Sequence, residues 1–358
     1  MIDFKAGGWR PAKDDARASR ISAANDLVTR TLAQHGLAPQ GGLSLPDRGM
    51  PASQLSGMMS QLMPSARAAA PMADLPQGAS FADDSFTCAA GTRRYRVYVP
   101  ASAEQGVTGL VLMLHGCTQT PEDFAAGTRM NALAEDHRLV VVYPHQSRGD
   151  NAQSCWNWFS RGDQQRDRGE PAILSGLTRQ VIDRHGVPAD RVFVAGLSAG
   201  AAMAVILGQS YPDLFAAVGA HSGLPHGAAR DVASAFAAMA GQGAEAPATG
   251  TAIRTIVFHG TADMTVHPSN GDKIVRHALD CGPAQSLQRD EQGQTEGRSF
   301  NRSVTLGDDG RPAVEHWVVT GMGHAWSGGH PSGSYTDAKG PDASAQMVRF
   351  FLADGPAQ

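Results

Sequence analysis

The stretch that decides the fold is Val192-Phe193-Val194-Ala195-Gly196-Leu197-Ser198-Ala199-Gly200. Its first four residues are apolar and predict a buried strand, and the alanine-rich run that follows predicts a helix. A G-x-S-x-G pattern between a strand and a helix is typical of a tight turn that exposes a nucleophilic serine. A Cβ two positions before or after the serine would meet neighbouring backbone, so both positions require glycine. We therefore predict that Ser198 lies on such a turn, at a helix N-terminus that favours negative charge.

Predicted strands and helices alternate on both sides of this turn. The alternating run Arg94–Val99 predicts an edge strand exposed on one face. Further strands are predicted at residues 109–114, 139–143, 216–220, 253–259 and 315–320, and helices at residues 120–134 and 170–185. This alternation implies parallel β-α-β units, and a series of this length implies an α/β, doubly wound, mostly parallel sheet with helices on both faces. Sites in such sheets lie at the carboxyl ends of the strands.

A serine hydroxyl becomes an effective nucleophile only when a base accepts its proton. His324 is the predicted base, because it follows the last predicted strand, where a loop can carry it over the sheet. In this fold the acid that orients the histidine lies between the serine and the histidine in the chain. Asp263 fits that order, because it lies about five residues beyond the strand Thr255–Phe258. Asp272 is the alternative, although it falls in the helix expected next.

The oxyanion of a tetrahedral intermediate needs N–H donors, and loss of one donor typically costs ~10²-fold or more in rate. One predicted donor is the backbone N–H of Ala199, immediately after the nucleophile. The second should come from the loop after the strand at residues 109–114, namely from Cys117 or from Thr118. A simple turn at the end of the strand is the alternative interpretation of Gly116-Cys117.

Five short motifs carry a family resemblance: His115-Gly116-Cys117-Thr118-Gln119, Ser154-Cys155-Trp156-Asn157-Trp158-Phe159, Gly196-Leu197-Ser198-Ala199-Gly200, His259-Gly260-Thr261-Ala262-Asp263 and Gly323-His324-Ala325-Trp326-Ser327-Gly328-Gly329. Together they resemble the poly(3-hydroxybutyrate) depolymerase-type esterase family, over about residues 83–352. The resemblance implies an α/β-hydrolase fold, a triad of Ser198, Asp263 and His324, and an oxyanion hole that includes the Cys117 amide.

The resemblance also implies a function. It indicates a carboxylic-ester hydrolase that works through an acyl-enzyme, on short-chain 3-hydroxyalkanoate (3-hydroxybutyrate) esters or oligomers. Relatives of the family include feruloyl and acetylxylan esterases, so an esterase of that type is the alternative. A serine peptidase of the same fold often carries a propeller or cap, for which residues 1–80 are too short. A non-catalytic, hydrolase-like binding protein would be expected to lack a triad member, and all three are present.

Three tryptophans are candidate substrate-binding residues. Trp156 and Trp158 lie in the aromatic segment that ends at Phe159, and Trp326 follows the predicted base by two positions. Large rigid rings bury apolar acyl chains at low entropic cost, so these rings would suit the wall of a cleft. The equal alternative for the first two is a structural anchor that holds a long loop against the core.

Composition narrows the partners. The chain has 358 residues with 42% hydrophobic and 18% charged residues, which is typical of a globular protein. A formal net charge of −4 gives no basic field that would attract nucleic acid or an anionic membrane. No run approaches the ~18 apolar residues of a membrane span. The expected partner is an ester substrate, with no cofactor and no metal.

The start of the sequence bears on location. Residues 1–10 lack the apolar core of a secretory signal, which favours a cytoplasmic location, although members of the family are often secreted. Members that attack insoluble polymer generally carry a signal peptide and a polymer-binding module. Neither is visible in this sequence, so soluble oligomers or small esters are favoured as substrates.

The four cysteines are Cys88, Cys117, Cys155 and Cys281. Cys117 ends one central strand, and Cys155 lies in the loop that leaves the next, so both belong to the same edge of the sheet. A disulfide between them is therefore expected beside the oxyanion hole, whereas a reducing cytosol would keep both thiols free. Cys88 and Cys281 are candidates for a second bridge.

Residues 1–80 differ in composition from the rest of the chain. Ala16–His35 has apolar residues at helical spacing and predicts one amphipathic helix. Residues 38–77 are rich in Pro, Gly, Ser, Ala and Met, which is typical of a flexible linker. Residues 81–358 then form the predicted catalytic domain.

Deletion of residues 1–78 is therefore expected to leave a folded and active domain, because a linker makes few contacts with a core. The truncated protein should keep a cooperative melting transition and the ester hydrolysis rate of the full chain. Loss of the transition would mean that this segment packs against the catalytic domain.

Overall fold

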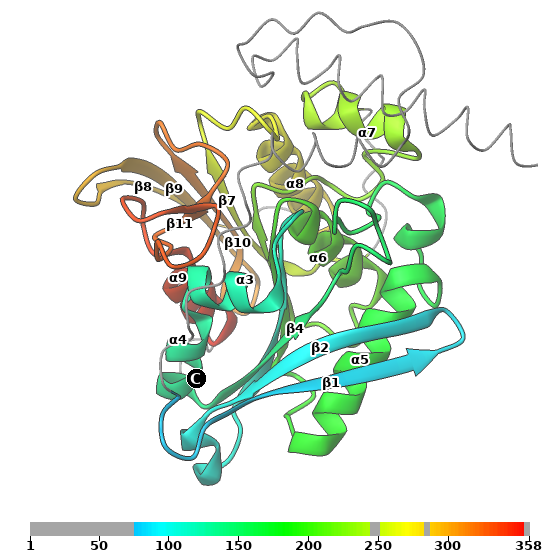
Figure 1. Cartoon of the computed structure of the whole chain (residues 1–358). Helices are drawn as coiled ribbons and strands as arrows, with labels where there is room; N and C mark the ends of the chain where they lie inside the picture. Colours follow the sequence, from blue (N-terminus) through cyan, green and yellow to red (C-terminus); the bar gives the residue numbers. More distant parts are fainter. Residues whose placement is uncertain (1–74, 244–250, 283–286, 354–358) are drawn as a thin grey trace, which may run out of the picture. The chain divides into compact units, whose positions relative to one another are not determined.

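The computed structural model describes residues 75–243, 251–282 and 287–353 (Figure 1). The helix and most of the linker predicted within residues 1–80 lie outside the described residues. The centre is a 10-stranded sheet with the order β1-β2-β4-β3-β5-β6-β7-β10-β9-β8. Its strands are β1 (Ser80–Cys88), β2 (Gly91–Val99), β3 (Gly109–Leu114), β4 (Leu139–Pro144), β5 (Val192–Leu197), β6 (Ala217–His221), β7 (Arg254–Gly260), β8 (Gln288–Gln294), β9 (Ser299–Leu306) and β10 (Pro312–Val319).

The middle of the sheet is parallel. The strands β4, β3, β5, β6, β7 and β10 pair in parallel in that order. Antiparallel strands extend it at both ends, with β1 and β2 on one side and β9 and β8 on the other. The prediction of a doubly wound, mostly parallel sheet is confirmed, whereas the prediction of an edge strand at residues 94–99 is wrong. β2 pairs with both β1 and β4, so β1 is the edge.

Helices cover both faces of the sheet (Figure 1). They are α3 (Pro121–Thr128), α4 (Met130–His137), α5 (Gly169–His185), α6 (Ala199–Ser210), α7 (Val232–Met239), α8 (Ser269–Asp280) and α9 (Ala343–Phe351), with short 3-10 turns at Ala101–Gln105 and Arg161–Gln164. Alternate residues of β3 serve two cores. Leu110, Leu112 and Leu114 share one core with α5 and α6, and Val111 and Met113 share the other with α3, α4 and α9. This is why the central strands are apolar throughout.

The single helix predicted at residues 120–134 is two helices. Thr120 caps α3 by accepting a hydrogen bond from the Asp123 N–H at 3.3 Å, as the sequence indicates. Arg129 then adopts a left-handed conformation with φ 54°, which ends α3 and begins α4. The apolar pattern continues across the break, because Phe124 and Met130 are both buried. Periodicity alone therefore did not reveal the interruption.

Cys117 and Cys155 form the predicted disulfide, which closes a loop of 38 residues. In the chain-entropy model a loop of that length contributes about 4 kcal/mol of stability. The second pairing is not formed. Cys88 ends β1, Cys281 follows α8, and both thiols are free. In the part of the chain that the structure describes, no helix is long and apolar enough to cross a membrane.

Thiol titration of the denatured protein is therefore expected to detect two thiols per chain before reduction and four after it. Peptide mapping should recover Cys88 and Cys281 alkylated and residues 117 and 155 in one linked peptide. Recovery of Cys117 and Cys155 as separate alkylated thiols would contradict the assignment.

Candidate active site

Ser198 lies at the tip of the turn from β5 to α6. Its backbone has φ 58° and ψ −120°, a conformation that a residue with a side chain rarely adopts, and it precedes the first helical residue, Ala199. The Ser198 N–H donates to the carbonyl of His221 at 2.9 Å, which holds the turn against the end of β6. This is the geometry of a nucleophile elbow at the carboxyl edge of the sheet.

Two glycines allow this turn to form. A Cβ at Gly196 would lie 2.5 Å from the carbonyl oxygen of Gly200 and 2.7 Å from that of Leu114. A Cβ at Gly200 would collide with the Leu114 carbonyl and lie 2.6 Å from the oxygen of His115. All of these neighbours are backbone atoms, which cannot move aside as a flexible side chain can. The predicted requirement for glycine at both positions is therefore explained by contact with the end of β3.

Asp263 and His324 are in direct contact. The Nδ1–H of His324 donates to Oδ2 of Asp263 at 2.7 Å, because a carboxylate can only accept. This bond selects one tautomer and leaves the Nε2 lone pair available for a proton. In the described part of the chain, Ser198 Oγ makes no hydrogen bond to His324. Such bonds are often long in unliganded enzymes and tighten when substrate binds.

The Asp263 carboxylate is buried but well supplied with donors. Its Oδ1 accepts from the N–H groups of Thr265 and Val266, each at 2.9 Å. The Nε2 of His259 lies 3.4 Å from Oδ2 and donates to the Val266 carbonyl at 2.9 Å. Burial opposes the charge, but the nearby His259 ring and the hydrogen bonds from His324 and the Val266 backbone hold the pKa of Asp263 well below its usual value. Asp263 therefore remains a carboxylate.

Backbone contacts hold the loops of the acid and the base together. β7 and β10 are neighbouring parallel strands, and each loop leaves a carboxyl end. The Ala262 N–H donates to the Met322 carbonyl at 3.0 Å, and the Gly321 N–H donates to the Thr261 hydroxyl at 2.8 Å. Asp272 lies elsewhere, on the exposed side of α8, where its carboxylate is 4.0 Å from the Nε2 of His316. The geometry therefore favours Asp263 over Asp272.

His221 is a buried residue that the sequence analysis did not single out. Its ring stacks on Trp326 with centroids 5.1 Å apart, and its Nε2 accepts from the Ser327 N–H at 2.9 Å. Burial and the nearby His259 and His324 lower the pKa of His221 well below its usual value, so it is neutral. It connects the Ser198 turn to the His324 loop. An ordinary histidine at a strand end gives no sequence signal of this role.

The turn at residues 115–118, here called the oxyanion turn, lies at the end of β3, beside the Ser198 turn. Among the described residues, the Cys117 and Ala199 backbone N–H groups donate to no other group. The Thr118 N–H donates to the Gln153 carbonyl at 3.0 Å, so it is already engaged. Of the two candidates for the second donor, Cys117 is therefore favoured.

The three predicted substrate-binding tryptophans are buried. Trp156 and Trp326 are 0% and 1% exposed, and Trp158 is 6% exposed. The indole N–H of Trp156 donates to the His115 carbonyl at 3.0 Å, and that of Trp326 donates to Ser344 Oγ at 3.0 Å. These contacts favour the structural alternative, in which the rings anchor loops to the core.

Exposed side chains near the site come from other residues. Tyr335 is 46% exposed, and its hydroxyl lies 3.2 Å from the hydroxyl of Thr118 in the oxyanion turn. Met264, which follows the acid, is 88% exposed. Tyr335 lies beyond the last motif recognised in the sequence, and no pattern there indicated an aromatic residue beside the turn.

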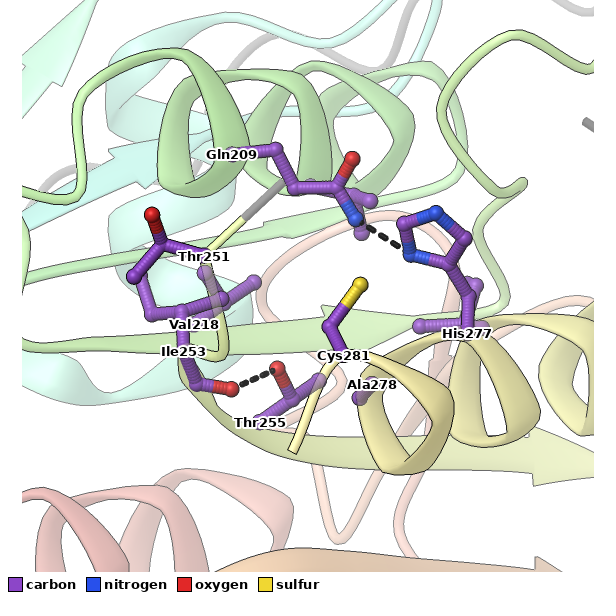
Figure 2. Close-up of a pocket in the computed structure, with 10 residues that line it drawn as sticks. Gln209, Val218, Thr251, Ile253, Thr255, His277, Ala278 and Cys281 are labelled. Atoms are coloured by element: carbon purple, nitrogen blue, oxygen red, sulfur yellow. Dashed lines mark hydrogen bonds between the residues drawn. The ribbon is translucent and has the colours of Figure 1, made fainter. Parts of the chain in front are cut away.

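A small cavity of about 10 Å³ lies between α6, β6, β7 and α8, with Gln209 hydrogen-bonded to His277 beside it (Figure 2). Its volume is sufficient for about one water molecule. None of the candidate triad residues lines it, so it is not the substrate site. In the described segments, no group of three or more His, Cys, Asp or Glu side chains is arranged to hold a metal ion.

Known proteins resemble this chain in sequence and in fold. Residues 93–288 match the model of the family described as Esterase PHB depolymerase. Poly(3-hydroxyalkanoate) depolymerase C of Paucimonas lemoignei is 34% identical over 233 residues, which cover 60% of this chain and 54% of that protein. Acetylxylan esterase A of Talaromyces purpureogenus is 28% identical over 215 residues, which cover 55% of this chain and 54% of that protein. The chain thus spans about half the length of these curated relatives.

Among solved structures, an acetyl xylan esterase from Aspergillus awamori matches with a TM-score of 0.57 and 18% identity, over 75% of this chain and 98% of that one. This match concerns the fold. It agrees with an α/β-hydrolase fold. The family match over more than half of the sequence identifies the chain as a member of the PHB depolymerase family of esterases.

Proposed function

We propose that the chain is a serine carboxylesterase that cleaves short-chain 3-hydroxyalkanoate esters or oligomers through an acyl-enzyme. The observation that carries the proposal is the 2.7 Å hydrogen bond between His324 and Asp263, at the same sheet edge as the Ser198 turn. Family membership and a relative named as a poly(3-hydroxyalkanoate) depolymerase support the substrate class.

Acylation would begin with attack of Ser198 Oγ on the ester carbon, while His324 Nε2 accepts the hydroxyl proton. Asp263 stabilises the imidazolium that forms, because its low pKa keeps it charged. The negative charge on the carbonyl oxygen is met by the N–H groups of Cys117 and Ala199, which have no other acceptor among the described residues. The intermediate then collapses, and the alcohol leaves with the proton held by His324.

Deacylation repeats these steps with water as the nucleophile. His324 Nε2 removes a proton from water, and the hydroxide adds to the acyl carbon. The same two N–H groups then stabilise the negative charge on the carbonyl oxygen by donating hydrogen bonds to it. Collapse returns the proton to Ser198 and releases the carboxylic acid. No cofactor is needed, because each proton and electron pair returns to its starting group.

The substrate would contact Tyr335 more than the predicted tryptophans. Trp156 and Trp326 are too buried to offer a ring face, whereas Tyr335 is 46% exposed beside Thr118. An exposed aromatic ring next to an oxyanion hole suits an apolar acyl chain or the next ester unit. Trp158 is 6% exposed and packs edge-on against Phe159, so it too serves as a core residue more than as a substrate contact.

The second candidate is an acetylxylan esterase, which the relative from Talaromyces purpureogenus supports by name. A hydrolysis panel of 3-hydroxybutyrate oligomers, acetylated xylan, feruloyl esters, p-nitrophenyl butyrate and a peptide anilide separates the candidates. Highest kcat/KM on the oligomers supports the proposed substrate class. Preference for acetylated xylan or for the anilide would replace it.

Ser198→Ala is expected to abolish ester hydrolysis and to leave the Tm nearly unchanged, because the hydroxyl acts on the transition state and contributes little to packing. A fluorophosphonate probe should label the wild type and not the variant. Retention of more than a tenth of the wild-type rate would remove Ser198 from this role.

Asp263→Asn is expected to lower kcat by ~10³-fold or more, because an amide favours the wrong imidazole tautomer. The matched control is Asp272→Asn, on an exposed carboxylate that does not contact His324, and its kcat should stay within twofold of the wild type. A larger loss in the control than in Asp263→Asn would reverse the assignment.

A further inference from the structure

The segment between β4 and α5 grips the oxyanion turn at residues 115–118. We call residues 146–157 the bracing loop. The backbone N–H of Gln146 donates to His115 Nε2 at 3.1 Å, and the indole N–H of Trp156 donates to the His115 carbonyl at 3.0 Å. Burial lowers the pKa of His115 to about 4, so its ring is neutral and Nε2 can accept. The two ends of the bracing loop therefore hold one residue of the turn.

Two more attachments lie further along the turn. The Cys117–Cys155 disulfide joins it covalently to the bracing loop, and the Thr118 N–H donates to the Gln153 carbonyl at 3.0 Å. Every residue of the turn except Gly116 is thus held by the bracing loop. Gly116 is held instead by Gln119, whose side-chain oxygen accepts its N–H at 2.9 Å. The position of the Cys117 N–H consequently depends on the position of the bracing loop.

Glu170, in the first turn of α5, joins the two ends of the bracing loop. It is 4% exposed. Its Oε1 accepts from the side-chain amides of Gln146 at 2.6 Å and Asn157 at 2.8 Å, and its Oε2 accepts from the Asn157 backbone N–H at 2.8 Å. Gln146 also donates to the Cys155 carbonyl at 2.9 Å, which extends the network to the disulfide. One buried carboxylate therefore closes the loop that carries the four attachments.

The charges around Glu170 are few and partly cancel. The guanidinium of Arg93 lies 3.8 Å from it and pairs more closely with Asp150, at 2.6 Å. Asp163 accepts the Glu170 backbone N–H at 2.8 Å. Burial raises the pKa of Glu170 to about 7, while the Asn157 N–H and Arg93 oppose this rise. A glutamine here would turn an amide NH₂ toward N–H donors on one side, so an isosteric change breaks the network.

We propose that Glu170 is a positioning residue for the oxyanion hole: it closes the bracing loop and thereby sets the direction of the Cys117 N–H. The inference rests on the proposed function, because it takes that N–H as the oxyanion donor. It assigns Glu170 no contact with substrate. Loss of Glu170 should weaken transition-state stabilisation and leave ground-state substrate binding intact.

The test compares Glu170→Gln with Glu315→Gln. Glu315, on β10, is a matched control because it is another buried carboxylate. It accepts hydrogen bonds from the side chains of Arg302, Arg349 and Trp317. Both variants are measured for Tm, for kcat and KM on p-nitrophenyl butyrate, and for Ki of an alkyl trifluoromethyl ketone. The ketone forms a hemiketal with Ser198 whose oxyanion tests the oxyanion hole directly.

For Glu170→Gln, kcat should fall ~10-fold or more with KM within twofold, and Ki of the ketone should rise by the same factor as kcat/KM falls. Glu315→Gln should lower the Tm with kcat and Ki within twofold of wild type. Unchanged kcat and Ki in Glu170→Gln, or a loss confined to KM, would overturn the proposal. A fall in kcat with unchanged Ki would do so as well.

If Glu170→Gln lacks a melting transition, Asn157→Ala takes its place, because it removes one donor from a half-buried position. It should show parallel changes of kcat and Ki of about threefold, and wild-type values would overturn the proposal. Fluorophosphonate labelling of the wild type distinguishes failure of the proposed function from failure of this inference. If Ser198 of the wild type is not labelled, both are wrong. If it is labelled and the Glu170→Gln variant has the kcat and Ki of the wild type, only the inference is wrong.

Discussion

The backbone contact between the Ser198 turn and the end of β3 is the constraint on which the site depends. Gly196 and Gly200 bring the turn so close to the Leu114 carbonyl that no Cβ fits between them. β3 is also where the chain order of the sheet reverses, since β4 pairs on one side of it and β5 on the other. Ligands of doubly wound folds bind at such reversals. The nucleophile and the oxyanion turn are therefore both positioned by the carboxyl end of β3.

Most of the fold could be predicted because the central strands are buried on both faces. A run such as Leu139–Pro144 is apolar throughout, and that signal needs no knowledge of its neighbours. The antiparallel strands at the ends of the sheet are harder to predict from the sequence. β8 is polar and almost wholly exposed, so its pairing with β9 left no apolar pattern to detect. The break at Arg129 was missed for a similar reason, because buried residues continue on both sides of it.

Some residues of the candidate site could likewise be predicted from local sequence, and others could not. Ser198, Asp263 and His324 were predicted from local motifs and chain order, and the contact between the last two agrees with that prediction. His221 and Glu170 were not singled out, because their importance comes from partners in other segments. The three tryptophans, in contrast, were predicted to bind substrate but are buried. Aromatic residues near a motif indicate a cleft wall or an anchor equally well, and only their burial separates the two. Residue type predicts chemistry, whereas tertiary contacts decide access.

Tyr335 is held differently from the residues of the triad. Its loop is attached on two sides. The Ser334 N–H donates to Asp123 and the Tyr335 hydroxyl lies near that of Thr118 on the oxyanion side, while the Tyr335 carbonyl accepts the Trp326 N–H at 2.7 Å, two residues beyond His324. The bonds that orient His324 come instead from the β7 side. The link to the His324 loop uses the Tyr335 backbone, whereas the contact with the oxyanion turn uses its side chain. A different side chain at 335 would therefore reshape the surface beside the oxyanion turn and still leave the backbone bond that supports the His324 loop in place.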